Sequence, residues 1–154
     1  LEAKQKLKFY YGNMNERQFR NVFRQALQKR GNTTENFIGL LERRLDTVIY
    51  RAKFATTVFS ARQLINHGHI KVNGKKVNIS SFLVSDKDTI ELKDKSKELL
   101  VVAGSLVSKE REIPDYIQMD EKNKIAKLIR VPKFSEVPYP TIMEPNLVVE
   151  YYSR

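Results

Sequence analysis

Residues 60–79 constrain the fold of this chain more than any other segment. They read SARQLINHGHIKVNGKKVNI, with an Asn-Gly pair at 73–74 between two short runs of alternating apolar and polar residues. Such a pair is the strongest local signal for a β-hairpin, because both residues tolerate the positive φ of a tight turn. The alternating apolar positions are Ile70, Val72, Val77 and Ile79. We therefore predict a hairpin with these four side chains toward the core.

A short helix is predicted directly before the hairpin. Ser60 and Gln63 have the spacing of a capping box, which marks the start of a helix. Gly68 is expected to end the helix as a left-handed residue beyond its last turn. Leu64 then faces the core and Arg62 points to solvent.

The other face of the hairpin is basic. It is formed by Lys71, Asn73, Lys75 and Lys76. Most hydrogen bonds from proteins to nucleic acids go to phosphate and sugar oxygens. We interpret the helix and hairpin as a small rigid platform that holds donors toward a phosphate backbone.

The charge of the chain is concentrated in its first half. The 154 residues include 28 Lys and Arg against 18 Asp and Glu, a formal net charge of +10. The net charge is +6 over residues 1–31, −2 over 32–42, +7 over 43–80 and −1 over 81–154. This excess favours a polyanionic partner, with nucleic acid ahead of an acidic membrane surface. The chain has no cysteine and no apolar run near the ~18 residues of a membrane span, which excludes thiolate zinc sites and predicts no membrane helix.

A first helix is predicted after Asn15, an N-cap residue with Gln18 three positions on, and is expected to end at Gly31. Its apolar stripe consists of Phe19, Val22, Phe23, Ala26 and Leu27, and its opposite face carries Arg17, Arg20 and Arg24. The arginine face has two interpretations, a solvated helix face or a contact with nucleic-acid phosphates. No glutamate is expected to pair with these arginines at a spacing of four, which leaves both interpretations open.

The rest of the chain predicts an α+β fold. Residues 35–54 are read as one further helix, with Phe37, Leu41, Leu45 and Val48 on one side and Arg43, Arg44, Arg51 and Lys53 crowding its later part. Residues 82–84 and 88–92 are read as two short antiparallel strands. Residues 137–145 contain three prolines and predict a loop. Pro145 is expected to begin a short helix that returns Leu147, Val148 and Tyr151 to the N-terminal helices.

Catalytic and metal-binding constellations are not predicted. His67 and His69 lack a third ligand nearby, so a hydrogen-bonded or RNA-facing pair is favoured over zinc. Asp86, Asp88 and Asp94 are interpreted as turn residues rather than a Mg²⁺ site. The tyrosines at 10, 11, 151 and 152 either stack on bases or pack in the core, and packing is favoured. We expect no cofactor and no enzymatic activity.

The block ARQLINHGHIKVNGKKVNI resembles the S-four RNA-binding module, a helix-helix-hairpin unit of several RNA-binding proteins. The resemblance extends through KQKLKFYYGNMNERQF, GNTTENFIGLLERRLDTVIYRAKFA, IRVP and LVVEYYSR. Together these segments are similar to the small-subunit ribosomal protein S-four family, of bacterial or organellar type. The chain begins at Leu1, so the N-terminal segment of that family, which holds a cysteine zinc site in some members, is expected to be missing.

The resemblance implies an all-helical rRNA-binding domain from residues 1–42 with 121–154, into which an S-four module with a small β-sheet is inserted at 43–120. It implies a structural protein that binds a multi-helix junction in the 5′ domain of small-subunit rRNA and nucleates assembly. Its implied neighbours are ribosomal protein S-five and the channel through which messenger RNA enters. Messenger RNA is a further candidate partner, and a membrane is not. The implied location is the bacterial ribosome in the cytoplasm, with an organellar ribosome as the alternative.

The residues expected to contact RNA fall in both segments. They are Arg17, Arg20, Arg24, Lys29, Arg30, Arg43, Arg44, Arg51, Lys53, Arg62, Gln63, His67, His69, Lys71, Asn73, Lys75 and Lys76. Arg44→Glu is accordingly expected to leave the fold intact, and residues 43–105 are expected to fold alone. Two other classes of protein compete with this interpretation, an RNA-modifying enzyme such as a pseudouridine synthase and a free-standing module that recognises stalled ribosomes. The first needs a separate catalytic domain, for which too little chain remains, and the second does not explain the resemblance outside the module.

Overall fold

The structure is a computed structural model that describes all residues, 1–154. It confirms the α+β class, with seven α-helices and a five-stranded antiparallel sheet. The chain divides into two compact units, residues 1–42 with 132–154 and residues 43–131. None of the helices has the length and apolar character needed to span a membrane.

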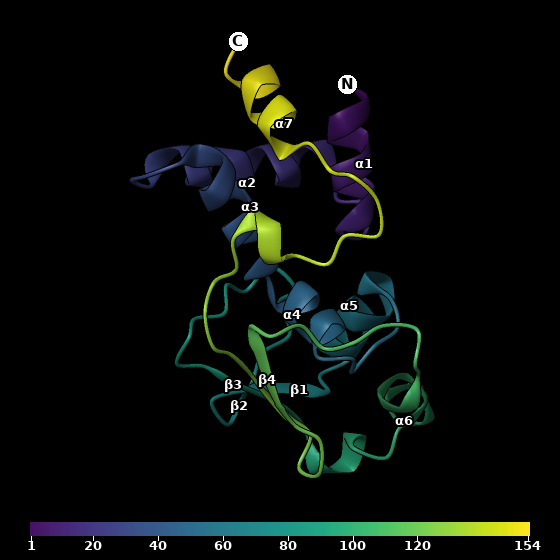
Figure 1. The fold of residues 1–154 in the computed structure, drawn as a ribbon. Coiled ribbons are helices and arrows are strands. Elements are labelled where there is room, and N and C mark those ends of the chain that lie inside the picture. The colour runs from purple at the N-terminus through teal and green to yellow at the C-terminus, as the bar shows by residue number, and fades with distance from the viewer. The chain divides into compact units, whose positions relative to one another are not determined.

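The first unit is helical and is built from both ends of the chain (Figure 1). Its elements are α1 (Glu2–Tyr10), α2 (Glu16–Gln28), α3 (Thr33–Glu42), the 3-10 turn η2 (Phe134–Glu136) and α7 (Pro145–Tyr152). α7 contacts α1, α2 and α3. Pro145 occupies the first turn of α7, as predicted, and residues 137–144 form the expected loop.

An aromatic cluster forms the core of this unit. The Phe37 ring centroid lies 5.1 Å from that of Phe19 and 6.1 Å from that of Phe23. The ring of Tyr152, from α7, lies 5.1 Å from Phe23. Tyr152 therefore supplies the inward aromatic side chain of α7, whereas the residue expected in that role, Tyr151, is 40% exposed.

The start of α2 is confirmed, since the Asn15 side chain accepts a hydrogen bond from the Gln18 N–H at 2.8 Å. The helix ends at Gln28, three residues before Gly31. Leu27 was expected in the apolar stripe but is 56% exposed, because it lies at the edge of that stripe in the last turn. The other four stripe residues are buried.

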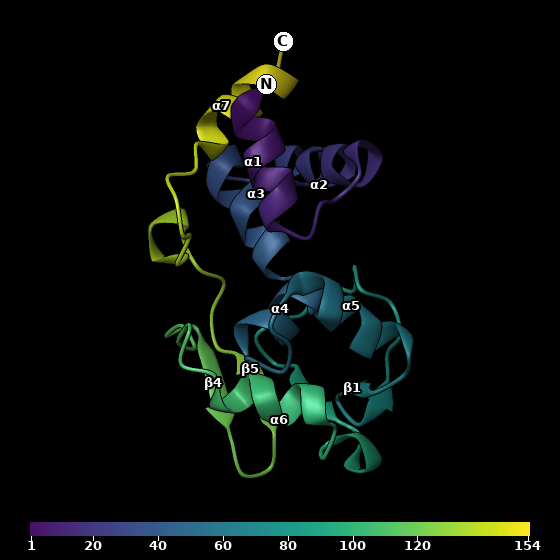
Figure 2. The ribbon, with the colours of Figure 1, turned by 90° about the vertical axis from the view of Figure 1, so that its right-hand side faces the viewer.

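The second unit packs two helices on one face of the sheet (Figure 2). Its elements are α4 (Leu45–Arg51), α5 (Val58–Asn66), β1 (Ile70–Val72), β2 (Lys75–Lys76), β3 (Thr89–Leu92), the 3-10 turn η1 (Asp94–Ser96), α6 (Leu100–Val107), β4 (Ile117–Asp120) and β5 (Ile125–Leu128). The strand order is β2-β1-β3-β5-β4, and every pair is antiparallel. Alternate residues of β1, β3 and β5 enter the core, namely Ile70, Val72, Ile90, Leu92, Ala126 and Leu128.

The predicted hairpin is present as β1 and β2. Asn73 has φ 52° and Gly74 has φ 81°, as a tight turn with two positive φ values requires. Lys71 pairs with Lys76, and Val72 pairs with Lys75. The second strand stops at Lys76, so the predicted continuation is wrong for Ile79, which is 59% exposed.

The helix predicted over residues 35–54 is interrupted. α3 ends at Glu42 and α4 begins at Leu45. The backbone of the interruption is used by another segment, since the Leu45 N–H donates to the Phe82 carbonyl and the Val84 N–H donates to the Arg43 carbonyl, each at 2.8 Å. Residues 82–84 therefore form an isolated bridge here rather than the predicted strand.

The cap of α5 also differs from the prediction. Thr57, not Ser60, is the N-cap, and its hydroxyl accepts a hydrogen bond from the Ser60 N–H at 3.0 Å. At the other end the prediction is confirmed, since Gly68 follows the helix with φ 79°. The side chain of Arg62 is directed to Asp46 rather than to solvent.

Residues 121–131 group with the second unit, whereas the expected domain boundary lay at 120/121. The reason is β5, which pairs with both β3 and β4 and contributes Ala126 and Leu128 to the core. The β4–β5 hairpin was not foreseen. Its turn is held by Asp120, whose carboxylate accepts hydrogen bonds from the backbone and side-chain amides of Asn123 at 3.1 and 2.9 Å.

Candidate nucleic-acid interface

The basic face of α2 is exposed. Arg17 and Arg24 lie on it, and Lys29 and Arg30 are exposed just beyond the end of the helix. Arg20 differs from these four, because its guanidinium lies 3.5 Å from the Glu16 carboxylate at a spacing of four residues. The expectation that no glutamate pairs with these arginines was therefore wrong for Arg20.

Glu16 connects three helices of the first unit. Its carboxylate accepts a hydrogen bond from the Tyr152 hydroxyl at 2.7 Å and lies 3.2 Å from the Lys4 ammonium and 3.1 Å from that of Lys8. Burial alone would raise the pKa of Glu16, but the hydrogen bonds from Tyr152 and the two lysines outweigh it and lower the pKa to about 2. Burial and the Glu16 charge raise the pKa of Tyr152. The network thus ties α7 to α1 and α2.

One buried carboxylate holds two of the candidate arginines. Asp46 is fully buried, and Arg44 approaches it with Nε at 3.2 Å and Nη2 at 3.1 Å. Arg62 Nε donates to the same carboxylate at 2.9 Å, and the Thr47 N–H donates at 2.7 Å. Arg44 is itself buried, so its guanidinium belongs to the interior of the unit. A buried guanidinium is unsuited to a direct RNA contact, and its ion pair with Asp46 argues against the expectation that Arg44→Glu leaves the fold intact.

Three further candidates are bound by backbone or ring groups of the second unit. Arg43 Nε donates to the Val84 carbonyl at 2.8 Å. Lys53 is buried with a positive φ of 67°, and its ammonium donates to the Ser108 carbonyl. Arg51 is buried with its guanidinium 5.6 Å from the ring centroid of Tyr50.

The candidates nearer the hairpin are more accessible. Gln63, His67, Asn73, Lys75 and Lys76 are exposed, and His69 and Lys71 are half-buried. His69 Nδ1 lies 2.7 Å from the Ser96 hydroxyl. The Asn73 side chain donates to Asp88 at 2.8 Å and accepts from the Thr89 N–H at 2.9 Å, so it holds the hairpin turn against β3. Asp88 also accepts from the Ser85 N–H at 2.9 Å, as its interpretation as a turn residue predicts.

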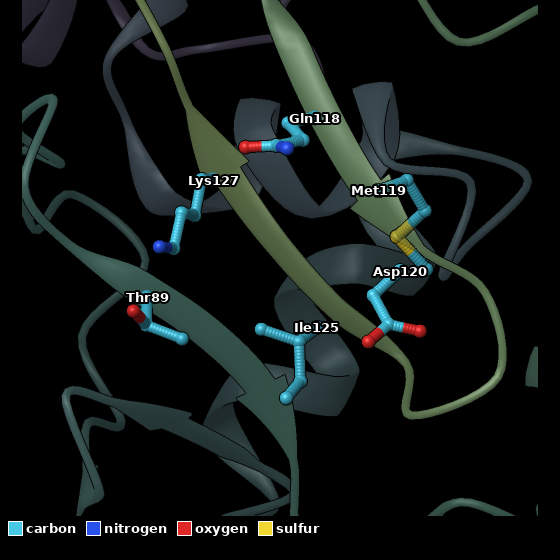
Figure 3. A pocket seen from close by; sticks show the side chains of 6 residues that line it. All are labelled: Thr89, Gln118, Met119, Asp120, Ile125 and Lys127. Atoms are coloured by element: carbon cyan, nitrogen blue, oxygen red, sulfur yellow. The ribbon is translucent and has the colours of Figure 1, made fainter.

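The outer face of the sheet has a different character. An open hollow of ≈ 390 Å³ lies over β3, β5 and β4, lined by Thr89, Gln118, Met119, Asp120, Ile125 and Lys127 (Figure 3). Its one lysine is offset by one aspartate, and its other polar groups are a hydroxyl and an amide. A nearly neutral surface of this kind is poorly suited to phosphate. None of the candidate residues lies in it.

The structure contains no group of three or more His, Cys, Asp or Glu side chains placed to hold a metal ion. His67 and His69 have ring centroids 6.3 Å apart. The arrangement of the basic side chains can bind anions through charge and hydrogen bonds, on the α2 face of the first unit and around the hairpin of the second.

Comparison with known proteins divides the chain at the same residue as the fold. Residues 1–42 match the ribosomal protein S4/S9 N-terminal domain, and residues 43–90 match the S4 domain. All 154 residues align with the small ribosomal subunit protein uS4 of Pelagibacter ubique at 68% identity, which covers 75% of that relative. The chain belongs to the uS4 family. The uS4 proteins of Gluconacetobacter diazotrophicus and Rhizobium meliloti are each 55% identical over the same 154 residues and the same share of their length.

Three residues that organise this uS4 family member were not singled out from its sequence. Asp46 is the only acidic residue between positions 43 and 80, and this indicates that it pairs with the lysines or arginines of the same segment. Glu16 stands four residues before Arg20, a spacing that predicts an ion pair on a helix. Arg111 donates to the carbonyls of Tyr50 and Ala55 and lies 3.9 Å from the Tyr50 ring centroid, and no local pattern indicates these contacts.

Proposed function

We propose that this chain is a structural protein of the small ribosomal subunit, without catalytic activity, whose principal partner is small-subunit rRNA. The observation that carries the proposal is the 68% identity, over every residue of the chain, to a protein named as a small ribosomal subunit protein. The S4 domain match and the net charge of +10 support an RNA partner independently of that name.

The finer assignment rests on the family resemblance. The chain binds a multi-helix junction in the 5′ domain of the rRNA, nucleates assembly there, and lies near the channel through which messenger RNA enters. Ribosomal protein S-five is its protein neighbour, and messenger RNA is a further candidate partner. The relatives named above are bacterial, which supports a bacterial ribosome in the cytoplasm, and an organellar ribosome stays the alternative.

Two surfaces make the RNA contacts in this proposal. The first is the α2 face with Arg17, Arg24, Lys29 and Arg30, to which Arg20 adds its part-neutralised charge. The second surrounds the hairpin and consists of Gln63, His67, His69, Lys71, Lys75 and Lys76. The remaining candidates support these surfaces through their contacts within the protein. Asn73, which is exposed, holds the hairpin turn against β3, and the others are Arg43, Arg44, Arg51, Lys53 and Arg62.

Co-sedimentation and chemical probing test the proposal together. The full chain should travel with small subunits and protect one region of the 5′ domain of naked small-subunit rRNA. If the chain stays in the fraction of free protein and protects no region of the rRNA, the ribosomal assignment is overturned.

A salt series tests the α2 surface. Each of Arg17→Ala and Arg24→Ala should weaken rRNA binding and reduce the slope of log affinity against log salt by about one for each lost phosphate contact. Gln25→Ala, an exposed and uncharged change on the same helix, is the matched control. Slopes that stay at the control value in both arginine variants would mean that this face is only solvated.

A further inference from the structure

A hollow of ≈ 180 Å³ lies in the second unit beside the C-terminal half of α5. Its apolar lining comes from Leu64 of α5 and from Leu99 and Val101 at the start of α6. Leu64 is buried, so the bottom of the hollow is part of the core, whereas Val101 is 47% exposed at its edge. A cavity of ~150 Å³ binds benzene, and pockets for drug-sized ligands start at ~300 Å³. The hollow therefore has the size of a single small aromatic ring system.

The rim of the hollow is polar. It is formed by Ser60, Gln63, His67 and His69. The amide of Gln63 offers both a donor and an acceptor, and the two imidazoles add ring nitrogens and flat faces. His69 is fixed by its 2.7 Å contact with Ser96, while Gln63 and His67 are exposed and adjustable. Donors, acceptors and an aromatic face around an apolar floor are the groups with which proteins read an unstacked base.

A cation lies beside this rim. The side chain of Lys76 runs over Gly68, so that a Cβ placed on Gly68 would lie 3.3 Å from Lys76 Cδ and 3.6 Å from its Nζ. Gly68 joins His67 to His69, both of which line the hollow. The ammonium group is therefore next to the rim. A nucleotide with its base in the hollow would have a counter-charge for its phosphate within reach.

We propose that the hollow between α5 and the start of α6 binds one unpaired nucleobase of RNA, with Lys76 on the adjoining phosphate. The inference rests on the proposed function in taking RNA as the ligand, and it goes beyond that function by adding a direct base contact. Phosphate contacts by themselves carry no sequence information, whereas a base held at Gln63 and His67 contributes to the choice of RNA site.

Titration of the full chain with nucleotides tests the hollow directly. The probes are uridine, cytidine, adenosine and guanosine 5′-monophosphates, with ribose 5-phosphate as the ligand that lacks a base. The measurement is the NMR shift of the methyl groups of Leu64, Leu99 and Val101. At least one mononucleotide should shift these methyls in a saturable way, and ribose 5-phosphate should not. The proposal is overturned if no mononucleotide shifts them up to its solubility limit, or if ribose 5-phosphate shifts them equally.

Variants separate base binding from general RNA binding. The double change Gln63→Ala with His67→Ala should weaken mononucleotide binding at least about fivefold, because stacking of one base on a side chain contributes about that much. Asn66→Ala, exposed on the same helix but outside the lining, is the matched control and should bind normally. Retained mononucleotide binding in the double variant would count against the proposal.

Filter binding of rRNA by the same proteins distinguishes failure of the base site from failure of the proposed rRNA-binding function. Normal rRNA affinity in the parent chain with no response to mononucleotides overturns the base site and leaves the proposed function standing. Failure of the parent chain to bind rRNA counts against the proposed function itself, whatever the mononucleotides do.

Discussion

At Asp46 a single buried carboxylate is shared by two arginines, and this sets the electrostatics of the second unit. The side chains of Asp46 and Arg44 are 1% and 7% exposed, so neither charge is solvated by water. Removing one partner of a buried pair leaves an uncompensated charge, which costs far more than the pair contributes. The basic residues of this segment therefore divide into those that hold the fold and those that are free to meet a ligand.

Arg44→Glu is expected to destabilise the protein by about 3–5 kcal/mol, because it places a second carboxylate against Asp46 in the interior. Lys75→Glu makes the same charge change on the exposed hairpin and is the matched control. Urea denaturation of both variants measures the difference in the free energy of unfolding. Equal free energies for the two variants would instead support the expectation that Arg44→Glu leaves the fold intact.

Glu16 predicts a dependence of stability on pH. Its pKa in the folded protein is about 2, below the ordinary value of 4.5, so the carboxylate stabilises the fold above pH 4.5. That stabilisation should be lost as the pH falls from 4.5 toward 2. Because the side chain is 35% exposed, solvent screening reduces its size, and we expect about 1–2 kcal/mol.

Denaturation at pH 6 and pH 3 measures the Glu16 contribution. Glu16→Gln should be less stable than the parent at pH 6 and should lose less stability on acidification. Glu150→Gln is the control, because Glu150 makes only an exposed pair with Arg154 at 3.8 Å. If Glu16→Gln loses as much free energy of unfolding between pH 6 and pH 3 as the parent, the loss is caused by other carboxylates.

Among the elements, the β1–β2 hairpin depends on the backbone of its turn. Gly74 has φ 81°, and no atom lies within 4 Å of the place that a Cβ would occupy, so a larger residue there meets strain and no clash. Gly74→Val should destabilise the hairpin by roughly 1–2 kcal/mol, because a β-branched residue rarely adopts positive φ. Lys75→Val, one residue on and in the strand, is the control. Thermal melts compare the two, and an equal melting temperature would contradict the strain argument.

The elements that could be predicted from the sequence are those fixed by local chemistry. Asn15 caps α2, Gly68 ends α5, and the Asn73–Gly74 turn makes the first hairpin. Pro145 begins α7. In each case one residue has a special backbone or side-chain preference that acts on its immediate neighbours. The residues that determine the element are therefore all found within a few positions of the sequence.

The elements that could not be predicted depend on distant segments. The helical pattern continues through Arg43 and Arg44, yet the helix breaks there because Phe82 and Val84 take up the backbone hydrogen bonds. The β4–β5 turn has no glycine, and Lys124 adopts φ 53° instead. The same holds for the candidate interface. The sequence predicts its positive charge, but it does not predict the burial of Arg44, Arg51 and Lys53, which follows from tertiary packing.

At the scale of the whole molecule, the limits of the second unit determine which fragment folds. Residues 43–131 contain the complete sheet and its core, so they should fold alone. Residues 43–105, the fragment expected from the sequence to fold, lack β4 and β5, including the buried residues Ala126 and Leu128. Circular dichroism and amide exchange should show cooperative unfolding for the longer fragment only. A stable 43–105 fragment would mean that β5 is dispensable.

The first unit should depend on both ends of the chain. The core of residues 1–42 is completed by α7, through the Tyr152 ring against Phe23 and the Tyr152 hydroxyl on Glu16. Isolated helices as short as α1, α2 and α3 are marginal in water. Residues 1–42 alone should therefore be largely unstructured, and addition of a peptide of residues 132–154 should raise their helicity in a saturable way. The same peptide with Tyr152→Ala is the control and should have a weaker effect. A fragment 1–42 that is stably folded and indifferent to either peptide would show that the C-terminal segment is not part of this unit.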